Sequence, residues 1–293
     1  MPQLTFVIPC YNYARYLRAC ADSIRAQSFT DWEMLIVDDT STDDTPDIAK
    51  TLTAEDARIR YHRHEQNIGH IANFNYGIER ANGELVWLIS ADDCLKDPGI
   101  VQEFVTQFRN NPKLGFAFCR VQCIEADSTP YDKYIPRAGH PKLPTQPGII
   151  PGQALFEFLI RENFVASPGA IARKACYERI GYFKPELTHS GDWYNWLAFA
   201  LDWDVFYEPE AKVYYRKHRQ NLHLTYADPN HTRENSLLCY TVLEQFMRTR
   251  KDDPKLIRQL QLARVQFMKK YEFPMTLPQK LTRLYGKLTG QYS

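Results

Sequence analysis

The feature that most constrains the fold of this chain is an uninterrupted apolar run, residues 85–89, followed closely by two adjacent carboxylates, Asp92 and Asp93. Five apolar residues without alternation are typical of a strand buried on both faces, as in the interior of a parallel sheet. In open α/β sheets the ligand lies outside the carboxyl ends of the strands, so these acids are expected at the mouth of a binding site. Paired carboxylates there suit Mg²⁺ or Mn²⁺, whose remaining ligands are commonly substrate phosphates. The alternative is a helix cap, because Asp is a favoured cap residue and Asp97 and Pro98 follow.

Short apolar runs alternate with helical spacing along the first hundred residues, which predicts a parallel sheet covered by helices on both faces. Residues 126–151 are rich in Pro, Gly and charge and lack periodicity, so we expect a long loop that acts as a lid or binding loop. Strands are predicted at 4–8, 32–37, 59–62, 85–89, 116–121, 205–207 and 211–215. Helices are predicted at 16–27, 46–52, 69–81, 98–109, 152–161, 174–180, 192–201 and from 232 onward, with breaks at Pro254, Pro274 and Pro278.

The overall composition excludes several classes of protein. A net charge of +1 argues against a nucleic-acid-binding surface spread over the molecule. Seven scattered cysteines, an odd number, are typical of reduced thiols rather than of a disulfide framework. Cys119 and Cys123 resemble half of a zinc site, but no second pair has zinc spacing. Because neither a signal peptide nor a long apolar segment is found, we expect a cytoplasmic protein.

Polar groups follow three of the predicted strands at their carboxyl ends. Residues 9–12 follow the first strand, Asp38 and Asp39 the second, and Asp92 and Asp93 the central one. A carboxylate at such an edge is suited to hold a ribose or a base edge, and Tyr11 could stack on a base. Each group alone is also typical of a turn or cap, but three together favour a ligand site.

Several stretches together resemble the family 2 glycosyltransferases with the GT-A fold. They are residues 7–12, 23–33, 36–43, 67–69, 75–77 and 81–84, and the similarity is close to about residue 98 and traceable to about residue 218. The resemblance implies an α/β fold with a Rossmann-like, mostly parallel sheet flanked by helices and a helical C-terminal extension. It divides the chain into a GT-A domain, 1–225, with a nucleotide-binding half at 1–98 and an acceptor-side half at 99–225, and an extension at 226–293. The residues implied to bind the nucleotide are Pro9, Tyr11, Asn12, Asp38, Asp39 and Asn67.

The same resemblance assigns the metal and the catalytic base. Asp92 and Asp93 are implied to bind Mn²⁺ or Mg²⁺ and the diphosphate, although Ser90 replaces the usual first acid of that motif. Asp192 is implied to be the catalytic base, with Gly191 where a second acid is common. Asp192 could instead be a helix N-cap, since Asp is a preferred cap residue.

A late strand and basic loop, residues 214–219, carry a further part of the match. Arg216 is implied to approach the diphosphate, and His218 the metal or the diphosphate. Cations near a leaving diphosphate offset its charge. The alternative is that these are solvated charges beside a surface His. Residues 163–169 resemble a segment that faces the acceptor in the family, or are only a turn.

The C-terminal tail is basic. From Arg250 to the end there are ten Lys or Arg against three acids, and the segment is amphipathic in places. Such helices pack on their own domain, pack on a second subunit in a homo-oligomer, or lie on an anionic membrane surface as a peripheral contact. The sequence leaves these three alternatives open.

The function expected from the resemblance is metal-dependent transfer of a sugar, with inversion, to an acceptor hydroxyl. The donor is a nucleotide diphosphate sugar, with UDP favoured, and the acceptor a saccharide or lipid-linked saccharide of bacterial cell-surface polysaccharide or glycolipid synthesis. A sugar nucleotidyltransferase would need a Gly-rich basic loop after the first strand, and residues 10–13 are not one. A non-catalytic sugar-nucleotide-binding or scaffold protein remains the rival, because of Ser90 and Gly191.

Overall fold

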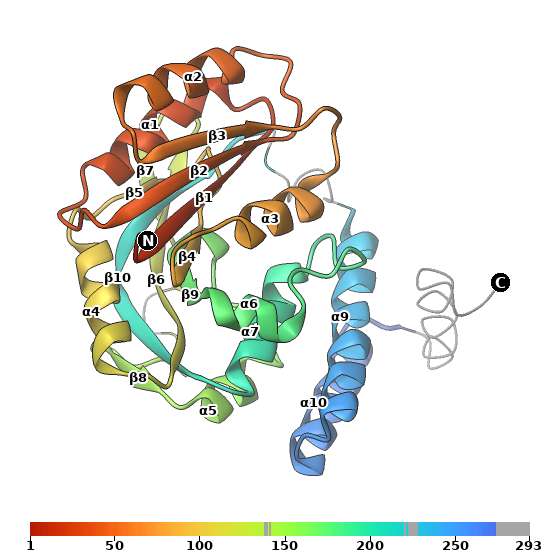
Figure 1. The fold of residues 1–293 in the computed structure, drawn as a ribbon. Helices are drawn as coiled ribbons and strands as arrows, with labels where there is room; N and C mark the ends of the chain where they lie inside the picture. Colours follow the sequence, from red (N-terminus) through yellow and green to blue (C-terminus); the bar gives the residue numbers. More distant parts are fainter. Residues whose placement is uncertain (138–139, 141, 220, 222–227, 274–293) are drawn as a thin grey trace.

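A computed structural model describes residues 1–137, 140, 142–219, 221 and 228–273 (Figure 1). The first half alternates strands and helices as the sequence predicts, with boundaries that differ by a few residues. Its elements are β1 (Leu4–Cys10), α1 (Ala14–Arg25), β2 (Trp32–Asp38), α2 (Thr45–Glu55), β3 (Ile59–Arg63), α3 (His70–Glu79), β4 (Leu85–Leu88), β5 (Cys94–Leu95) and α4 (Ile100–Asn110). The second half contains β6 (Leu114–Glu125), β7 (Pro130–Ile135), β8 (Gly148–Ile150), α5 (Gly152–Leu159), the 3₁₀ turn η1 (Ser167–Gly169), β9 (Ala170–Arg173), α6 (Lys174–Ile180), α7 (Gly191–Ala200), β10 (Asp204–Lys217), α9 (Pro229–Arg250) and α10 (Pro254–Lys270).

The strands form one mixed sheet in the order β3-β2-β1-β4-β9-β6-β10-β5, with β7 paired to β6 and β8 to β10. Strands β3, β2, β1 and β4 are parallel to one another, so their carboxyl ends meet at one edge. The second half is mostly antiparallel, because β9 runs against both β4 and β6, while β6 and β10 are parallel. The predicted α/β class with helices on both faces is therefore confirmed, and the parallel arrangement holds mainly for the first half of the chain.

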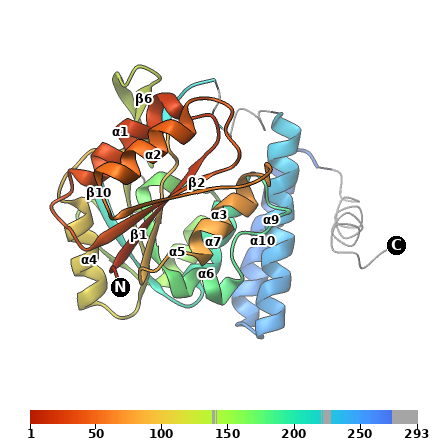
Figure 2. The ribbon, with the colours of Figure 1, turned by 45° about the horizontal axis from the view of Figure 1, so that its top comes forward.

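The sheet is apolar on both faces because helices cover both. Val86 and Leu88 of β4 pack into a core with α3, α5, α6, α7, α9 and α10, whereas Leu85 and Trp87 pack into a second core with α1, α2 and α4. Figure 2 shows these two layers on either side of the sheet. Burial on both sides explains why this strand lacks the alternation of a half-exposed one.

Three features of the structure differ from the sequence prediction. Residues 126–151 are not simply a loop, because they contain β7, which forms a hairpin with β6, and β8, which lies along β10. The two late strands are one long strand, β10, with register shifts near Glu208 and Ala211. The short strands β5 and β9 were not predicted at all, since two to four residues give little periodic signal.

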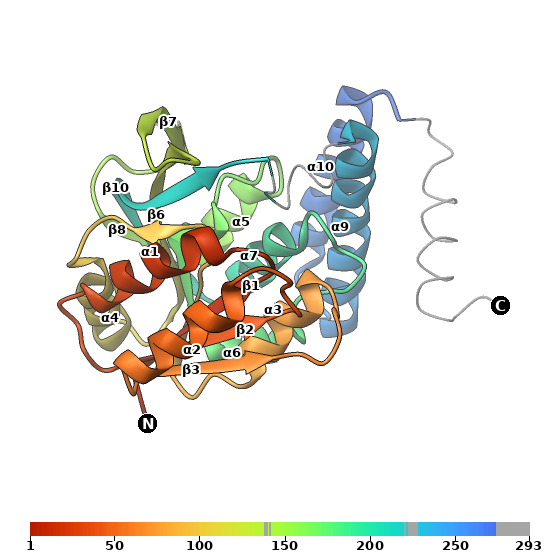
Figure 3. The same ribbon diagram turned by 90° about the horizontal axis from the view of Figure 1, so that it is seen from above.

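Helices α9 and α10 lie side by side along the α7 side of the molecule (Figure 3). Each begins with the same signature: Asp228 and Asp253 cap the helices by accepting a backbone N–H two residues on, and Pro occupies the first turn. Their apolar residues, including Leu243 and Leu260, belong to the same core as α7. Of the three alternatives for the basic tail, packing on its own domain holds for α9 and α10. The helix break at Pro254 is confirmed.

The remaining tail, including Pro274 and Pro278, lies outside the described residues, as does the boundary predicted at 225/226. None of the helices in the described part of the chain has the length and apolarity needed to cross a membrane.

Candidate active site

Two adjoining cavities lie at the edge where the parallel strands end. One has a volume of about 420 Å³ and is lined mainly by the segments after β1 and β2 and by the start of α3. The other, of about 300 Å³, lies between the segment after β4 and the start of α7. We call them the nucleotide-side cavity and the catalytic cavity, after the roles that the sequence predicts for residues lining each of them. The residues that line both are Pro9, Tyr13, His70, Phe74 and Ser90.

Pro9, Tyr11, Asn12, Asp39 and Asn67, all predicted from the sequence, line the nucleotide-side cavity. Tyr11 is 49% exposed, so its ring is available to a ligand. Asn12 has a positive φ of 58°, and its side-chain oxygen accepts the backbone N–H of Thr42 at 2.8 Å. The loop after β1 is thereby tied to the loop after β2, and the two form one wall.

Asp39 is buried and fixes the far side of this cavity. Its two carboxylate oxygens accept the backbone N–H groups of Ile68 at 2.7 Å and Gly69 at 3.0 Å. The Asn67 side-chain amide donates to the Asp39 carbonyl at 3.1 Å. The positive φ of Gly69, 83°, lets the chain turn into α3 at this point. The sequence therefore brings Asp39 and Asn67 together, as predicted.

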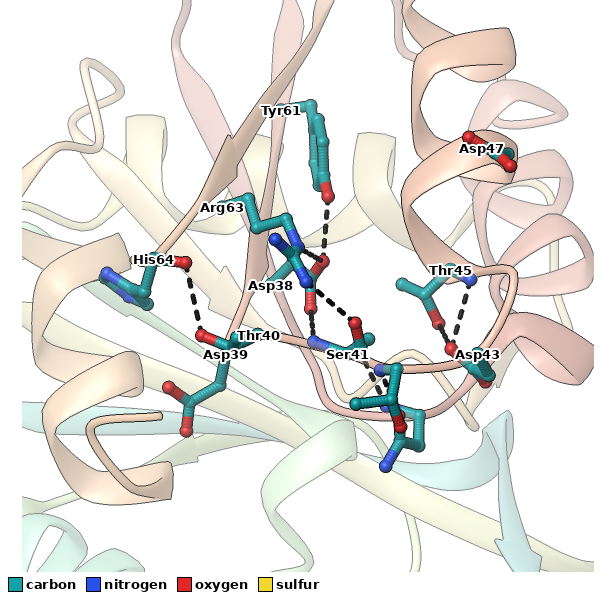
Figure 4. Close-up of polar contacts among 12 residues, drawn as sticks. Asp38, Asp39, Thr40, Ser41, Asp43, Thr45, Asp47, Tyr61, Arg63 and His64 are labelled. Atoms are coloured by element: carbon teal, nitrogen blue, oxygen red, sulfur yellow. Dashed lines mark hydrogen bonds and ion pairs between the residues drawn. The ribbon is translucent and has the colours of Figure 1, made fainter. Parts of the chain in front are cut away.

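Asp38 points away from Asp39 and lines neither cavity (Figure 4). Its fully buried carboxylate accepts the Ser41 N–H at 2.8 Å and the Tyr61 hydroxyl at 2.7 Å, and it pairs with Arg63 at 3.4 Å. Successive strand residues face opposite sides of a sheet, which explains the separation. Asp38 thus holds the β2–α2 turn against β3, and its contact with the nucleotide stays a prediction.

Asp92 and Asp93 both line the catalytic cavity and are nearly fully buried. Asp92 Oδ2 is hydrogen-bonded to His218 Nε2 and to the Asn221 side-chain amide, each at 2.9 Å. Asp93 Oδ1 accepts the backbone N–H of Arg216 at 2.9 Å. Burial, and next the charge of Asp92, raise the pKa of Asp93 well above its usual range. The alternative that these acids merely cap a helix is not supported, because α4 begins eight residues after Asp92.

The donor set at this place fits a divalent cation. Asp92 Oδ1 is buried and has no hydrogen-bond partner among the residues that the structure describes, a state that a bound cation would relieve. Among the described residues, no cluster of three or more His, Cys, Asp and Glu side chains could hold a metal by itself. Carboxylates supplemented by substrate phosphates are the usual Mg²⁺ arrangement. His218, expected as a metal ligand, contacts Asp92 directly, which is the position of a group that orients a ligand.

Arg216 lies behind the site rather than in it. Its side chain is 2% exposed, with Nε donating to the Asp92 carbonyl at 2.7 Å and a terminal nitrogen donating to Ser128 Oγ at 2.8 Å. The guanidinium also lies 4.8 Å from the ring of Tyr16. Its donors are directed at the protein, and it supports the Asp92–Asp93 segment. The approach of Arg216 to the diphosphate stays a prediction.

Asp192 lines the catalytic cavity together with Asp92 and Asp93. Its Oδ1 accepts the Trp193 N–H at 2.7 Å, and its Oδ2 accepts from the Asn163 side-chain amide at 3.4 Å. Burial raises the pKa of Asp192 to about 6, so the group is ionised at neutral pH and is a stronger base than a solvated Asp. Ser190, not Asp192, is the residue at the N-cap of α7, so the cap interpretation is wrong.

The two departures from the family pattern lie beside these acids. Ser90 lines both cavities. At Gly191 an added Cβ would come within 3.1 Å of the Phe183 ring, so Phe183 occupies the space that a side chain there would need. This part of the cavity wall is apolar as a result.

Sequence reasoning missed other residues of the site. Asn221 holds Asp92, and its only signal was its position three residues after His218. His70 lines both cavities, and its Nε2 lies 3.0 Å from the Thr188 carbonyl, which ties α3 to the segment before α7. Asn163 was not missed, because it begins the segment expected to face the acceptor; it contacts Asp192 and lines the catalytic cavity.

Residues 5–179 match the model of Glycosyl transferase family 2. The chain belongs to this family. Over 134 residues it is 34% identical to a putative teichuronic acid biosynthesis glycosyltransferase, TuaG, of Bacillus subtilis, which covers 46% of this chain and 52% of the relative. Over 96 residues it is 35% identical to the GalNAc(5)-diNAcBac-PP-undecaprenol beta-1,3-glucosyltransferase of Campylobacter jejuni, which covers 32% of this chain and 31% of the relative. The matches thus span between about a third and half of these relatives' length.

Solved structures show the same fold. The crystal structure of residues 1–349 of TarS from S. aureus superposes with a TM-score of 0.69 at 17% identity, over 94% of this chain and 73% of that one. The same protein in complex with UDP-GlcNAc gives a TM-score of 0.65 at 17% identity, over 91% of this chain and 81% of that one. The mannosyltransferase PcManGT from Pyrobaculum calidifontis, in complex with GDP-Man and Mn²⁺, gives a TM-score of 0.59 at 14% identity. The superposition covers 100% of this chain and 81% of that one. The GT-A fold predicted from the sequence is confirmed.

Proposed function

We propose that the protein transfers a sugar from a nucleotide diphosphate sugar to an acceptor hydroxyl, with inversion at the anomeric carbon. The observation that carries the proposal is that Asp192, with a pKa of about 6, lines the same cavity as Asp92 and Asp93, and that this cavity adjoins the one formed by Tyr11 and Asp39. The proposed positions of the nucleotide, the diphosphate and the acceptor would then follow one another along the sheet edge.

In this proposal the nucleotide occupies the cavity between the loops after β1 and β2. Tyr11 offers a ring face for the base, and Asp39 and Asn67 offer hydrogen-bonding groups. A UDP-sugar is the favoured donor, supported by the UDP and UDP-GlcNAc complexes of the structurally similar TarS.

Asp92 and Asp93 would hold Mn²⁺ or Mg²⁺ together with the diphosphate, with His218 and Asn221 orienting Asp92. When bound, the ion would supply Lewis-acid stabilisation of the departing diphosphate. Support comes from the buried, unpaired Asp92 Oδ1 and from the Mn²⁺ complex of a protein with the same fold. The buried Arg216 keeps the Asp92–Asp93 segment in place from behind.

Asp192 acts as general base. The acceptor oxygen forms a bond to the anomeric carbon from the face opposite the diphosphate, the bond between that carbon and the diphosphate oxygen breaks, and the hydroxyl proton passes to the Asp192 carboxylate. The base is ionised above pH 6, and its contacts with Trp193 and Asn163 fix its orientation. One displacement of this kind inverts the anomeric centre.

For the acceptor we propose a saccharide or lipid-linked saccharide of bacterial cell-surface polysaccharide or glycolipid synthesis, made in the cytoplasm. The names of the teichuronic acid and undecaprenol-linked relatives support this class. A non-catalytic sugar-nucleotide-binding protein is the second candidate, favoured by Ser90 and Gly191 in place of common acids. Turnover of a donor separates the two.

The binding half of the proposal is tested by thermal shift with UDP, GDP, dTDP and CDP, each with Mn²⁺, Mg²⁺ or chelator. A ligand at a hundred times its dissociation constant adds about 2.7 kcal/mol, enough to move the midpoint by several degrees. We expect a shift with UDP that disappears with chelator. A shift with none of the four nucleotides would overturn the proposal.

A further inference from the structure

A third cavity, of about 420 Å³, lies between the segment after α5, the start of α7, and helices α9 and α10. We call it the α10 cavity. Most of its wall lies beyond residue 179, where the family match ends. It shares Asn163 and His189 with the catalytic cavity and no residue with the nucleotide-side cavity. The three cavities therefore follow in order, with the catalytic cavity, which Asp192 lines, between the nucleotide-side cavity and the α10 cavity.

The wall of the α10 cavity carries several aromatic rings, and the polar atoms of two of them are hydrogen-bonded to the backbone. The Trp193 indole N–H donates to the Leu159 carbonyl at 2.7 Å, and the Tyr240 hydroxyl donates to the Ile160 carbonyl at 2.6 Å. These rings thus present mainly hydrocarbon to the cavity. The half-buried ring of Phe267 on α10 lies beside them, 5.7 Å from Tyr240. Aromatic faces next to hydrogen-bonding groups suit a saccharide, which has apolar C–H faces and a polar rim.

The polar part of the wall is cationic overall. Arg161 and Lys270 line the cavity, against one acid, Glu162. Arg161 donates to the Gln266 side chain at 3.2 Å, which holds its guanidinium at the cavity. Lys270 is exposed in the last turn of α10, with its Nζ 5.1 Å from the Tyr271 ring. Two cations beside an aromatic wall favour an anionic group on the occupant.

We propose that the α10 cavity binds an anionic saccharide unit of the acceptor, next to the unit whose hydroxyl reacts at Asp192. This inference rests on the proposed function and adds the acceptor's charge and its path along α10. Asn163 joins the two cavities, because it contacts the base and lines both. Helices α9 and α10 then have a role in acceptor selection besides covering the core.

The test uses an array of bacterial glycans with neutral, uronate-bearing and phosphate-bearing units, probed with the full chain and with two variants. Lys270→Glu reverses a charge that lines the cavity, whereas Lys269→Glu reverses the charge of its exposed neighbour in the same helical turn, which does not line it. Both variants reverse one positive charge in the last turn of α10. A difference between them therefore reports on the cavity and not on the helix C-terminus. Thermal shift with UDP, and UDP release from UDP-GlcNAc into water, are measured on all three proteins.

We expect the unmodified chain to bind uronate- or phosphate-bearing glycans. Lys270→Glu should lower that binding about tenfold, as expected for one lost charge-assisted hydrogen bond, and Lys269→Glu should leave it within twofold. UDP binding and release stay unchanged in both variants. Binding that is absent, confined to neutral glycans, or equally affected by the two substitutions overturns the inference. If UDP binding and release were also absent, the proposed function itself would fail.

Discussion

Replacing Asp192 with Asn separates catalysis from folding at the proposed base. The Asn side chain has nearly the same shape, and its carbonyl oxygen can still accept the Trp193 N–H. It cannot accept a proton from the acceptor hydroxyl. Loss of a general base costs roughly 10²- to 10⁴-fold in rate, so we expect turnover to fall by that factor. UDP affinity should change little, because Asp192 does not line the nucleotide-side cavity.

The same substitution has a stability consequence that can be worked from the pKa. Burial raises the pKa of Asp192 from 3.8 to about 6. Between these values the folded protein keeps a proton that the unfolded chain has released, so stability falls as pH rises through this window. At about 1.36 kcal/mol per pKa unit, the charged carboxylate costs up to about 3 kcal/mol at pH 7. The Asp192→Asn variant should therefore unfold at an equal or higher temperature at pH 7, with the advantage vanishing near pH 4.

The assay is nucleotide release from a UDP-sugar between pH 5 and 8, combined with thermal unfolding at pH 4 and 7. The activity of the unmodified protein should fall about tenfold for each pH unit below pH 6. The residual activity of the Asp192→Asn variant should not show this decrease at low pH. Asp47→Asn is the matched control, since Asp47 also lies in a first helical turn but is exposed and far from the cavities. A variant with full turnover, or with unchanged pH dependence, would refute the role of Asp192.

Three further outcomes follow from the site. Asp92→Ala should abolish the chelator-sensitive thermal shift with UDP, because it removes the unpaired ligand oxygen; an unaltered shift would exclude Asp92 as a ligand. Asp38→Ala should lower the unfolding free energy by about 2 kcal/mol, from the lost buried hydrogen bonds, and leave the Kd for UDP unchanged in calorimetry; weaker UDP binding at full stability would restore Asp38 to the nucleotide site. Gly191→Glu should lower the unfolding temperature, because its Cβ would lie 3.1 Å from the Phe183 ring; a variant of equal stability would show that Phe183 moves to accommodate the side chain.

The sequence was sufficient for the residues whose positions depend only on strand order. Asp39 and Asp92 follow recognisable strands, and a parallel arrangement brings strand ends to one edge. Asp192 lies in the first turn of α7, and only the family resemblance assigned it to the site. It was not sufficient for side-chain direction. Asp38 and Asp39 are neighbours in sequence, yet one faces the β2–α2 turn and the other the cavity. Arg216 was expected at the diphosphate because it is charged, and the structure buries it behind Asp92.

The remaining differences come from pairing over long sequence distances. β9 inserts antiparallel between β4 and β6 with only four residues, too few for a periodic signal. β7 is largely exposed, so its sequence is polar and predicts a loop. It forms a strand because it pairs with β6. Asn221 contacts Asp92 although more than a hundred residues separate them in the sequence, and no local sequence pattern predicts that contact.

Nucleotide release from a panel of UDP-sugars in the presence of Mn²⁺ most directly tests whether this chain transfers sugars. We predict that the unmodified protein releases UDP from at least one donor, that Asp92→Ala releases none, and that Asp192→Asn is slower by roughly 10²- to 10⁴-fold. Absence of release from every donor by a protein that still binds UDP would contradict catalysis and leave a sugar-nucleotide-binding protein with a glycosyltransferase fold.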